Sequence, residues 1–182
     1  MTIALIAIIV VIALLLIVAY NGLAGLRVRA DSAWSDIDVQ LKRRHDLIPN
    51  LVETVKGYAA HEKGTFENIA RYRSAAMSAN TVDEKAQAEG QLTQALRGLL
   101  AVAENYPELK ASEQFTSLQS SLGQTEDAIQ NSRRYYNAVV RDLNTKIATF
   151  PSNIVAGMFS FQPRQFFQTE TPEDRATPVV KF

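Results

Sequence analysis

The fold is decided by residues Ile3 to Ala19, which read IALIAIIVVIALLLIVA and contain no charge, proline or glycine. At about 1.5 Å per residue, a helix of this length is about 25 Å long, close to the hydrocarbon thickness of a bilayer. Tyr20 and Asn21 then have the polarity expected where a helix leaves the membrane. The stretch predicts a single transmembrane anchor over residues 1–22, in contact with the lipid bilayer through residues 3–20.

Two other interpretations of this segment are weaker. A cleaved secretion signal needs a basic start and a small-residue cleavage site, and the sequence around the apolar run supplies neither. A helix buried in a soluble core normally keeps a polar face, which this segment lacks. We therefore expect the segment to stay in the protein as an anchor.

Composition limits what the anchor can carry. The 182-residue chain has 19 basic and 19 acidic side chains, so it has no overall charge to attract nucleic acid. It has no cysteine, which excludes disulfides, thiolate metal ligands and a cysteine nucleophile. Roughly 160 residues follow the anchor, enough for one domain with a hydrophobic core.

After the anchor, apolar residues recur at steps of three and four, the period of an amphipathic helix. The first stripe continues the anchor helix, and we expect Pro49 to interrupt it because proline removes a backbone donor. Three more helices follow, with capping residues at Asn80–Asp83, a stop at Pro107 and Ser112 as an N-cap. The four stripes are Leu23, Leu26, Ala30, Ala33, Ile37, Leu41 and Ile48; Val52, Val55, Ala59, Phe66, Ile69 and Ala76; Ala88, Leu92, Ala95, Leu99, Val102 and Tyr106; and Phe115, Leu118, Leu122, Ile129, Tyr136, Val139, Leu143 and Ile147.

Long amphipathic helices with short connections predict an all-α fold, in which the N-terminal transmembrane helix continues into an antiparallel up-and-down bundle of about four long helices. Repeated prolines divide the chain from Pro151 onward, so we expect only a short apolar helix over residues 153–161 there. The expected organisation is an anchor at 1–22, a helical bundle at 23–161 and an extended or poorly ordered C-terminal tail at 162–182.

Several motifs resemble those of the LemA family. The most specific is RRHDLIPNLV from Arg43 to Val52, and the resemblance covers nearly the whole chain. It implies a bacterial single-anchor membrane protein with an α-helical bundle, and it assigns no biochemical activity. The other motifs are Tyr20-Asn21, Ala33-Trp34, IDVQL at 37–41, VKGYA at 55–59, His61-Glu62, Ala70-Arg71, YPELKA at 106–111, RRYYN at 133–137, FPSN at 150–153 and the end of the chain from Pro178 to Phe182.

The RRHDLIPN segment has a structural and a binding interpretation. In the structural one, Asp46 or Asn50 caps a helix that restarts after Pro49, while Arg43 and Arg44 form a solvated basic turn. In the other, the two arginines bind a carboxylate on a neighbouring helix or a lipid phosphate. We favour the structural interpretation because nearby aspartates balance the basic charge.

Three charged residues stand among the apolar stripes. Glu62 and Arg73 lie at helical positions in the second stripe, and Arg133 interrupts the stripe of the last long helix. Long side chains at the edge of a stripe often reach water. We also consider an interhelical ion pair between Glu62 and Arg133, which would fix the alignment of the two helices.

No pattern in the sequence indicates catalysis or a cofactor. His61-Glu62 begins a zinc-peptidase motif, but Thr65 stands where the second histidine is required. No serine lies in a nucleophile elbow, and there is no glycine-rich phosphate loop. We therefore predict no catalytic, cofactor-binding or metal-binding residue and a protein that is not an enzyme. The candidates for structural or interaction roles are Arg43, Arg44, Asp46, Pro49, Asn50, Glu62, Arg73 and Arg133.

The expected function is that of a non-enzymatic, membrane-anchored scaffold or accessory protein of the bacterial envelope that acts through protein contacts. A membrane-tethered sensor or adaptor that binds a ligand or signalling partner is the alternative. We expect homo-oligomers formed through the anchor and the Leu23–Ile48 stripe, and a membrane-protein partner is also considered. A polar face of the last long helix would add lateral contacts through Gln119, Gln124, Asn131 and Arg134.

The basic residues predict the sidedness of the anchor. Arg27, Arg29 and the segment from Lys42 to Arg44 follow the anchor, and no basic side chain precedes it. The positive-inside rule then favours a single pass through the bacterial inner membrane, with the N-terminus outside and the bundle in the cytoplasm. Family members whose anchor resembles a lipoprotein signal favour the opposite side, but this chain lacks the cysteine of such a signal.

Overall fold

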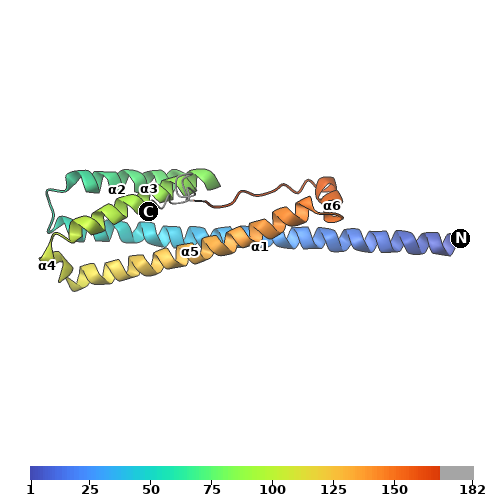
Figure 1. Ribbon diagram of the computed structural model, residues 1–182, viewed down its shortest axis with the longest axis horizontal. Helices are drawn as coiled ribbons and strands as arrows, with labels where there is room; N and C mark the ends of the chain where they lie inside the picture. Colours follow the sequence, from blue (N-terminus) through green and yellow to red (C-terminus); the bar gives the residue numbers. More distant parts are fainter. Residues whose placement is uncertain (169–182) are drawn as a thin grey trace, which may run out of the picture. The chain divides into compact units, whose positions relative to one another are not determined.

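The computed structural model describes residues 1–168, which form helices and their connections, with no strand in that part of the chain (Figure 1). The prediction of an all-α fold is confirmed. Residues 169–182, most of the expected tail, lie outside the described residues. The helices are α1 (Thr2–Lys56), α2 (Lys63–Ser78), α3 (Val82–Ala103), α4 (Pro107–Lys110), α5 (Glu113–Ala148) and α6 (Ser152–Met158).

Helix α1 contains both the apolar segment and the first amphipathic stripe without a break, as predicted. It is long and apolar enough to cross a membrane, and 0% of its most apolar window is buried. A core helix of a soluble protein would bury such a window. Its length, composition and exposure therefore fit a membrane span.

Pro49 does not interrupt α1, contrary to the prediction. The helix continues to Lys56, and the chain turns over the six residues that precede Lys63. The second predicted stripe is therefore divided between two helices. Val52 and Val55 belong to α1, and Phe66, Ile69 and Ala76 belong to α2.

Capping groups begin α3 and α5 where the sequence predicts them. The Thr81 hydroxyl accepts a bond of 3.2 Å from the Glu84 N–H, and the Glu84 carboxylate accepts one of 3.1 Å from the Thr81 N–H. This capping box satisfies two backbone donors that a helix start leaves free. Ser112 Oγ accepts a bond of 3.4 Å from the Phe115 N–H at the start of α5. Pro107 differs from the prediction, because α3 ends before it and the proline begins α4.

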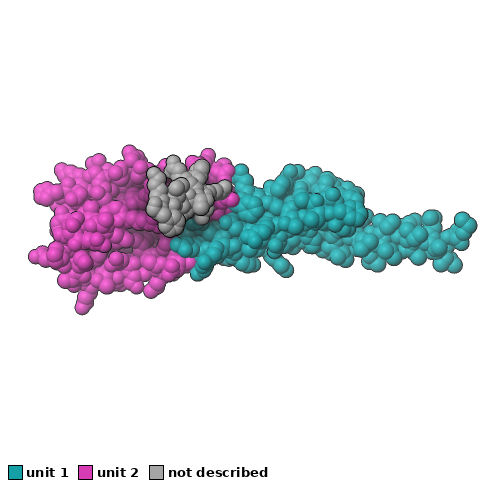
Figure 2. Space-filling model, in the orientation of Figure 1, with its two compact units in different colours: residues 1–39, 129–166 teal, residues 40–128, 167–182 magenta. Residues whose placement is uncertain are grey.

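The chain divides into two compact units, coloured separately in Figure 2. Unit 1 comprises residues 1–39 and 129–166, and unit 2 comprises residues 40–128 and 167–182. In unit 1, α5 runs antiparallel to α1. The Trp34 ring lies 5.4 Å from the Tyr136 ring, and Lys146, further along α5, lies beside Gly22, which is earlier in α1.

Unit 2 has one hydrophobic core, to which α1, α2, α3, α4 and α5 all contribute. The part of α1 in this core is Ile48, Leu51 and Val55, on the face that also carries the buried Arg44 and His45. The buried members of the core are Ile48, Leu51, Val55, Ala59, Phe66, Ile69, Ala76, Leu92, Leu96, Leu99, Ala103, Leu109, Phe115 and Leu122. Such a face is what makes a helix pack in a bundle.

Candidate functional site

A buried polar cluster lies within unit 2, centred on Arg44 of α1. The arginine is only 1% exposed. Its Nη1 lies 2.7 Å from Glu126 Oε2 of α5 and 3.0 Å from Thr93 Oγ1 of α3, and its Nη2 contacts Glu89 Oε2 of α3. The planar guanidinium can serve several acceptors at once, which is why arginine rather than lysine suits such a position.

The acceptors of Arg44 are held in place by their own helices. Glu89 lies on the buried side of α3 together with Ala86 and Leu92. Thr93, one turn later, donates its hydroxyl to the Glu89 carbonyl at 2.9 Å while accepting from Arg44. This arrangement uses both the donor and the acceptor capacity of the threonine hydroxyl. Arg44 Nε is buried and has no hydrogen-bond partner among residues 1–168.

His45 adds a second group beside the same carboxylate. Its Nε2 lies 2.9 Å from Glu89 Oε1, as an ion-pair contact rather than a well-directed hydrogen bond. Burial raises the pKa of Glu89, but His45 and the charge of Arg44 together outweigh it, so the pKa lies below its usual value. Two carboxylates thus face one permanent cation, and the His45 ring lies beside one of them.

A hydrogen bond to the backbone carbonyl of His45 accounts for the continuation of α1 past Pro49. In a regular helix this oxygen would accept the N–H of the residue four positions later, which is proline and has none. Arg73 of α2 fills the gap, because its Nε donates to the His45 carbonyl at 2.9 Å. Arg73 thus replaces the missing helical hydrogen bond from outside the helix.

The remaining residues of the RRHDLIPN segment lie at the surface. Arg43 is exposed, whereas its neighbour Arg44 is buried, so the two do not form one basic turn. Asp46 pairs with Lys42 at 2.8 Å, a hydrogen bond that lowers the pKa of Asp46. The Asn50 carbonyl accepts a bond of 2.8 Å from the Thr54 hydroxyl. The predicted capping role of Asp46 or Asn50 is wrong, because no helix restarts after the proline.

Of the other two charged candidates, Arg133 lies in the last long helix as its stripe predicted, whereas Glu62 does not lie in a helix. Glu62 is in the turn before α2, at the N-cap position, and not inside a helix. Arg133 lies in α5 and is half-buried. Glu62 belongs to unit 2 and Arg133 to unit 1. The ion pair between them remains a prediction.

Three members of the cluster are not among the candidates predicted from the sequence, namely Glu89, Thr93 and Glu126. The predicted third stripe used Ala88 and Ala95, whereas the buried positions of α3 are Ala86, Glu89, Leu92, Leu96, Leu99 and Ala103. This buried series continues at steps of three and four if an acidic residue is allowed in it. A glutamate at an apolar position was the available signal for a buried partner of Arg44.

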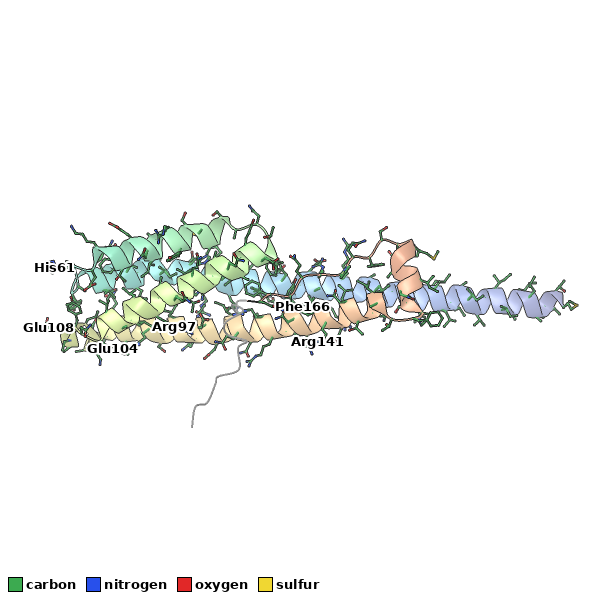
Figure 3. All side chains as sticks on the ribbon, turned by 45° about the horizontal axis from the view of Figure 1, so that its top comes forward. His61, Arg97, Glu104, Glu108, Arg141 and Phe166 are labelled. Atoms are coloured by element: carbon green, nitrogen blue, oxygen red, sulfur yellow. The ribbon has the colours of Figure 1, made fainter. Side chains whose placement is uncertain are left out.

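The chemistry of the cluster is ion pairing between helices. Its cation and the nearest carboxylate are enclosed, whereas the Glu126 side chain is 31% exposed. Within residues 1–168, no three histidine, aspartate or glutamate side chains converge as metal ligands. His61, from the partial zinc-peptidase motif, is exposed in the turn before α2 (Figure 3).

Comparisons with known proteins relate both units to a described family. The sequence matches the family model described as the LemA family over residues 33–182, a range that includes every member of the cluster. Magnetosome protein MamQ 2 of Paramagnetospirillum magneticum is 25% identical, over 91% of this chain and 70% of its own. Protein LemA of Metamycoplasma hominis is 31% identical, over 78% of this chain and 65% of its own. Magnetosome protein MamQ of Magnetospirillum gryphiswaldense is 23% identical, over 91% of this chain and 70% of its own.

Proposed function

The chain belongs to the LemA family, and from this premise we propose that it is a membrane-anchored, non-enzymatic scaffold that self-associates through the outer face of α1. The charges at its centre are used to hold helices together, which leaves surfaces rather than a reactive site as the means of action. The relatives named as magnetosome and LemA proteins carry no enzyme name, in keeping with this proposal.

The observation that carries the proposal is a second stripe on α1, opposite the buried one. We call it the outer stripe. Its members recur at alternating steps of four and three, and all are exposed and uncharged. This is the spacing at which two parallel helices pack together. The outer stripe consists of Ala7, Val11, Leu14, Val18, Asn21, Gly25, Val28, Ser32, Ser35 and Val39.

The polar members of the outer stripe can be buried at little cost. Ser32 Oγ donates to the Val28 carbonyl and Ser35 Oγ to the Asp31 carbonyl, each at 3.1 Å. Both hydroxyl donors are therefore satisfied within α1 before any partner arrives. Small side chains such as these, with Gly25, let two helices approach closely.

This surface differs from the contact surface expected from the sequence. Leu23, Ala30, Ala33 and Ile37 are buried within the chain, so the Leu23–Ile48 stripe is already occupied. The outer stripe lies on the free side of the same helix. Insertion of the apolar segment would orient all copies alike and raise their effective concentration, so weak contacts along the stripe would suffice.

The test is the mass of the full-length protein in a mild detergent, measured by light scattering over a hundredfold dilution. We expect oligomers for the natural sequence and a single chain for Ser35→Arg, which places a charge in the part of the outer stripe that follows the apolar segment. Ser74→Arg is the matched control, because Ser74 is an exposed serine of α2 outside the stripe. A natural protein of single-chain mass at every concentration would overturn the proposal. So would equal effects of the two substitutions.

A further inference from the structure

Helix α6 is apolar on both of its sides although it lies at the surface of unit 1. Val155 and Ala156 are buried. Ile154, Met158 and the flanking Phe159 are exposed, as is Phe150 before the helix. A surface helix normally presents polar residues to water, and Asn153 is the one polar residue on the exposed side of α6. One side of α6 packs on the protein, and we therefore expect its exposed side to contact a second apolar environment.

The level of α6 along α1 identifies that environment. Figures 1 and 3 both show α6 lying crosswise to α1. The Tyr20 ring, where the apolar segment ends, lies 4.8 Å from the Phe159 ring and 5.8 Å from the Phe161 ring. Tyrosine at such a position marks a membrane–water interface. A crosswise helix at this level would lie in the plane of the membrane surface, as interfacial helices do.

A cavity with basic groups adjoins the same end of unit 1. It has a volume of about 210 Å³, less than the usual size of a pocket for a drug-sized ligand. Its lining includes Arg27 and Arg164 and the polar residues Ser160 and Gln162, together with Leu143, Phe161 and Pro163. Asp31 Oδ1 lies 2.5 Å from Arg164 Nη2, which leaves one net positive charge among these three charged residues. A small cavity with this charge fits a phosphate-bearing headgroup.

Hydrogen bonds hold the main chain on two sides of the cavity. The Arg164 N–H donates to Asn144 Oδ1, and Asn144 Nδ2 donates to the Arg164 carbonyl, both at 2.8 Å. Ser160 has a φ of 55°, and the Phe161 N–H bonds the Ala156 carbonyl at 2.9 Å as the chain turns back from α6. These bonds fix one wall of the cavity on α5 and the other on the end of α6.

We propose that α6 and the adjoining cavity form a second membrane-contact site. The exposed side of α6 enters the headgroup region, and Arg27 and Arg164 bind the phosphate of a phospholipid headgroup. Arginine binds phosphate through paired hydrogen bonds, and its charge is attracted to an anionic surface. The site rests on the proposed insertion of α1, because that insertion brings α6 to the surface of the bilayer.

The first test measures the depth of α6 in vesicles of phosphatidylcholine and phosphatidylglycerol. The chain has no cysteine, so single substitutions can be labelled specifically with a polarity-sensitive fluorophore. In the reconstituted full-length protein, we expect nitroxide lipids to quench a label at Met158→Cys and its emission to shift to shorter wavelength. Met77→Cys is the matched control, since Met158 is 65% exposed and Met77 is 59% exposed, in α2.

A third label, at Leu15→Cys, distinguishes the two proposals that this test involves, namely the insertion of α1 and the membrane contact of α6. Quenching at Leu15 shows that α1 is inserted, and a Met158 label that then behaves like the Met77 label overturns the second site alone. If the Leu15 label is not quenched, α1 is not inserted and the second site fails with it. Self-association is measured separately by light scattering, so its failure cannot be mistaken for either result.

The second test addresses the phosphate. The Met158→Cys protein in neutral detergent is titrated with short-chain phosphatidylglycerol and, separately, with inorganic phosphate. We expect Arg27→Gln to weaken lipid binding at least about tenfold, because it removes a charge-assisted hydrogen bond to the phosphate. Arg29→Gln alters an exposed arginine of α1 outside the cavity, so it should lose only the non-directional attraction to the anionic lipid, about fivefold at most. Equal effects of the two substitutions, or inorganic phosphate binding as well as the lipid, would overturn a headgroup site.

Discussion

Arg44 is a buried cation, and contacts from two other helices offset the free-energy cost of removing its charge from water. Removing an arginine from water costs several kcal/mol, and ion pairs with Glu89 and Glu126 return about as much. The net gain in stability is therefore small. A helix that slid along α1 would leave one of these charges buried without its partner. The cluster therefore fixes the alignment of α3 and α5 on the unit 2 part of α1.

The first prediction is that Arg44→Met strongly destabilises the protein. The substitution leaves Glu89 buried without its cation, so we expect the free energy of unfolding to fall by about 3–5 kcal/mol. Urea unfolding followed by circular dichroism, in a fixed mild detergent, measures the change. Arg43→Met is the control, because Arg43 is exposed and should matter by no more than about 0.5 kcal/mol. Equal losses would show that the cluster does not hold the helices.

The second prediction concerns acid. The pKa of Glu89 is lower in the folded protein than its usual 4.5, so the unfolded chain takes up a proton at a higher pH than the folded one does. Its contribution to stability is thus complete above 4.5 and is lost as the pH falls through the folded value. We expect Glu89→Gln to flatten the fall of the urea midpoint between neutral pH and about pH 3.5.

Asp46 provides the control for this acid prediction. Its pKa is also lowered, through the hydrogen bond from Lys42, but the pair is exposed. High salt should remove the contribution of this surface pair and leave that of Glu89 largely intact. If salt abolished both contributions equally, Glu89 would not titrate as a buried group.

At the scale of residues, the candidates predicted from the sequence include Arg44 but none of its acceptors in the buried cluster. The RRHDLIPN motif drew attention to Arg44, and a carboxylate on a neighbouring helix was one of the partners considered. Glu89 is not predicted, because the third apolar stripe runs through Ala88 and Ala95, which are neighbours of the buried positions Glu89 and Leu96. Alanine is small and is tolerated on both the buried and the exposed face of a helix. Its positions therefore do not show clearly which face is buried.

At the scale of elements, Pro49 shows why a helix end is difficult to predict. Proline removes a donor from the helix and leaves the carbonyl of His45 without its usual partner. That loss ends a helix unless another group supplies the hydrogen bond. Arg73 does so from α2, a contact between residues that are far apart in the sequence. Local propensity alone could not have indicated it.

The third prediction is that Pro49 and Arg73 are energetically coupled. Arg73→Met should cost about 1–3 kcal/mol in the free energy of unfolding, because the half-buried His45 carbonyl loses its donor. Pro49→Ala restores the backbone N–H, so we expect Arg73→Met to cost about 1 kcal/mol less in that background. A double-mutant cycle by urea unfolding measures the difference. Strict additivity of the two effects would show that the Arg73 side chain does not replace the backbone N–H that is missing at position 49.

At the scale of the whole molecule, the apolar segment and the helical period were enough for an all-α fold with a long first helix. They could not indicate that α1 carries two stripes, because one apolar face is expected of any bundle helix and the outer stripe is made of small and polar residues. The side of the membrane and the order of the tail remain predictions. The first depends on the cell's insertion machinery, and the second falls on residues 169–182.

The last prediction concerns the independence of the bundle from its anchor. Residues 2–18 are all exposed, so their side chains add nothing to the core. A chain that lacks them should be soluble without detergent, strongly helical by circular dichroism and cooperative in thermal unfolding. The matched control removes residues 2–23 and so deletes Leu23, which is 0% exposed. The longer deletion also removes Tyr20, whose ring contacts Phe159 and Phe161. Its stability should therefore fall by at least about 1.5–3 kcal/mol relative to the shorter deletion, the value of one buried leucine. An unfolded product of the shorter deletion would mean that the apolar segment is itself part of the folded domain.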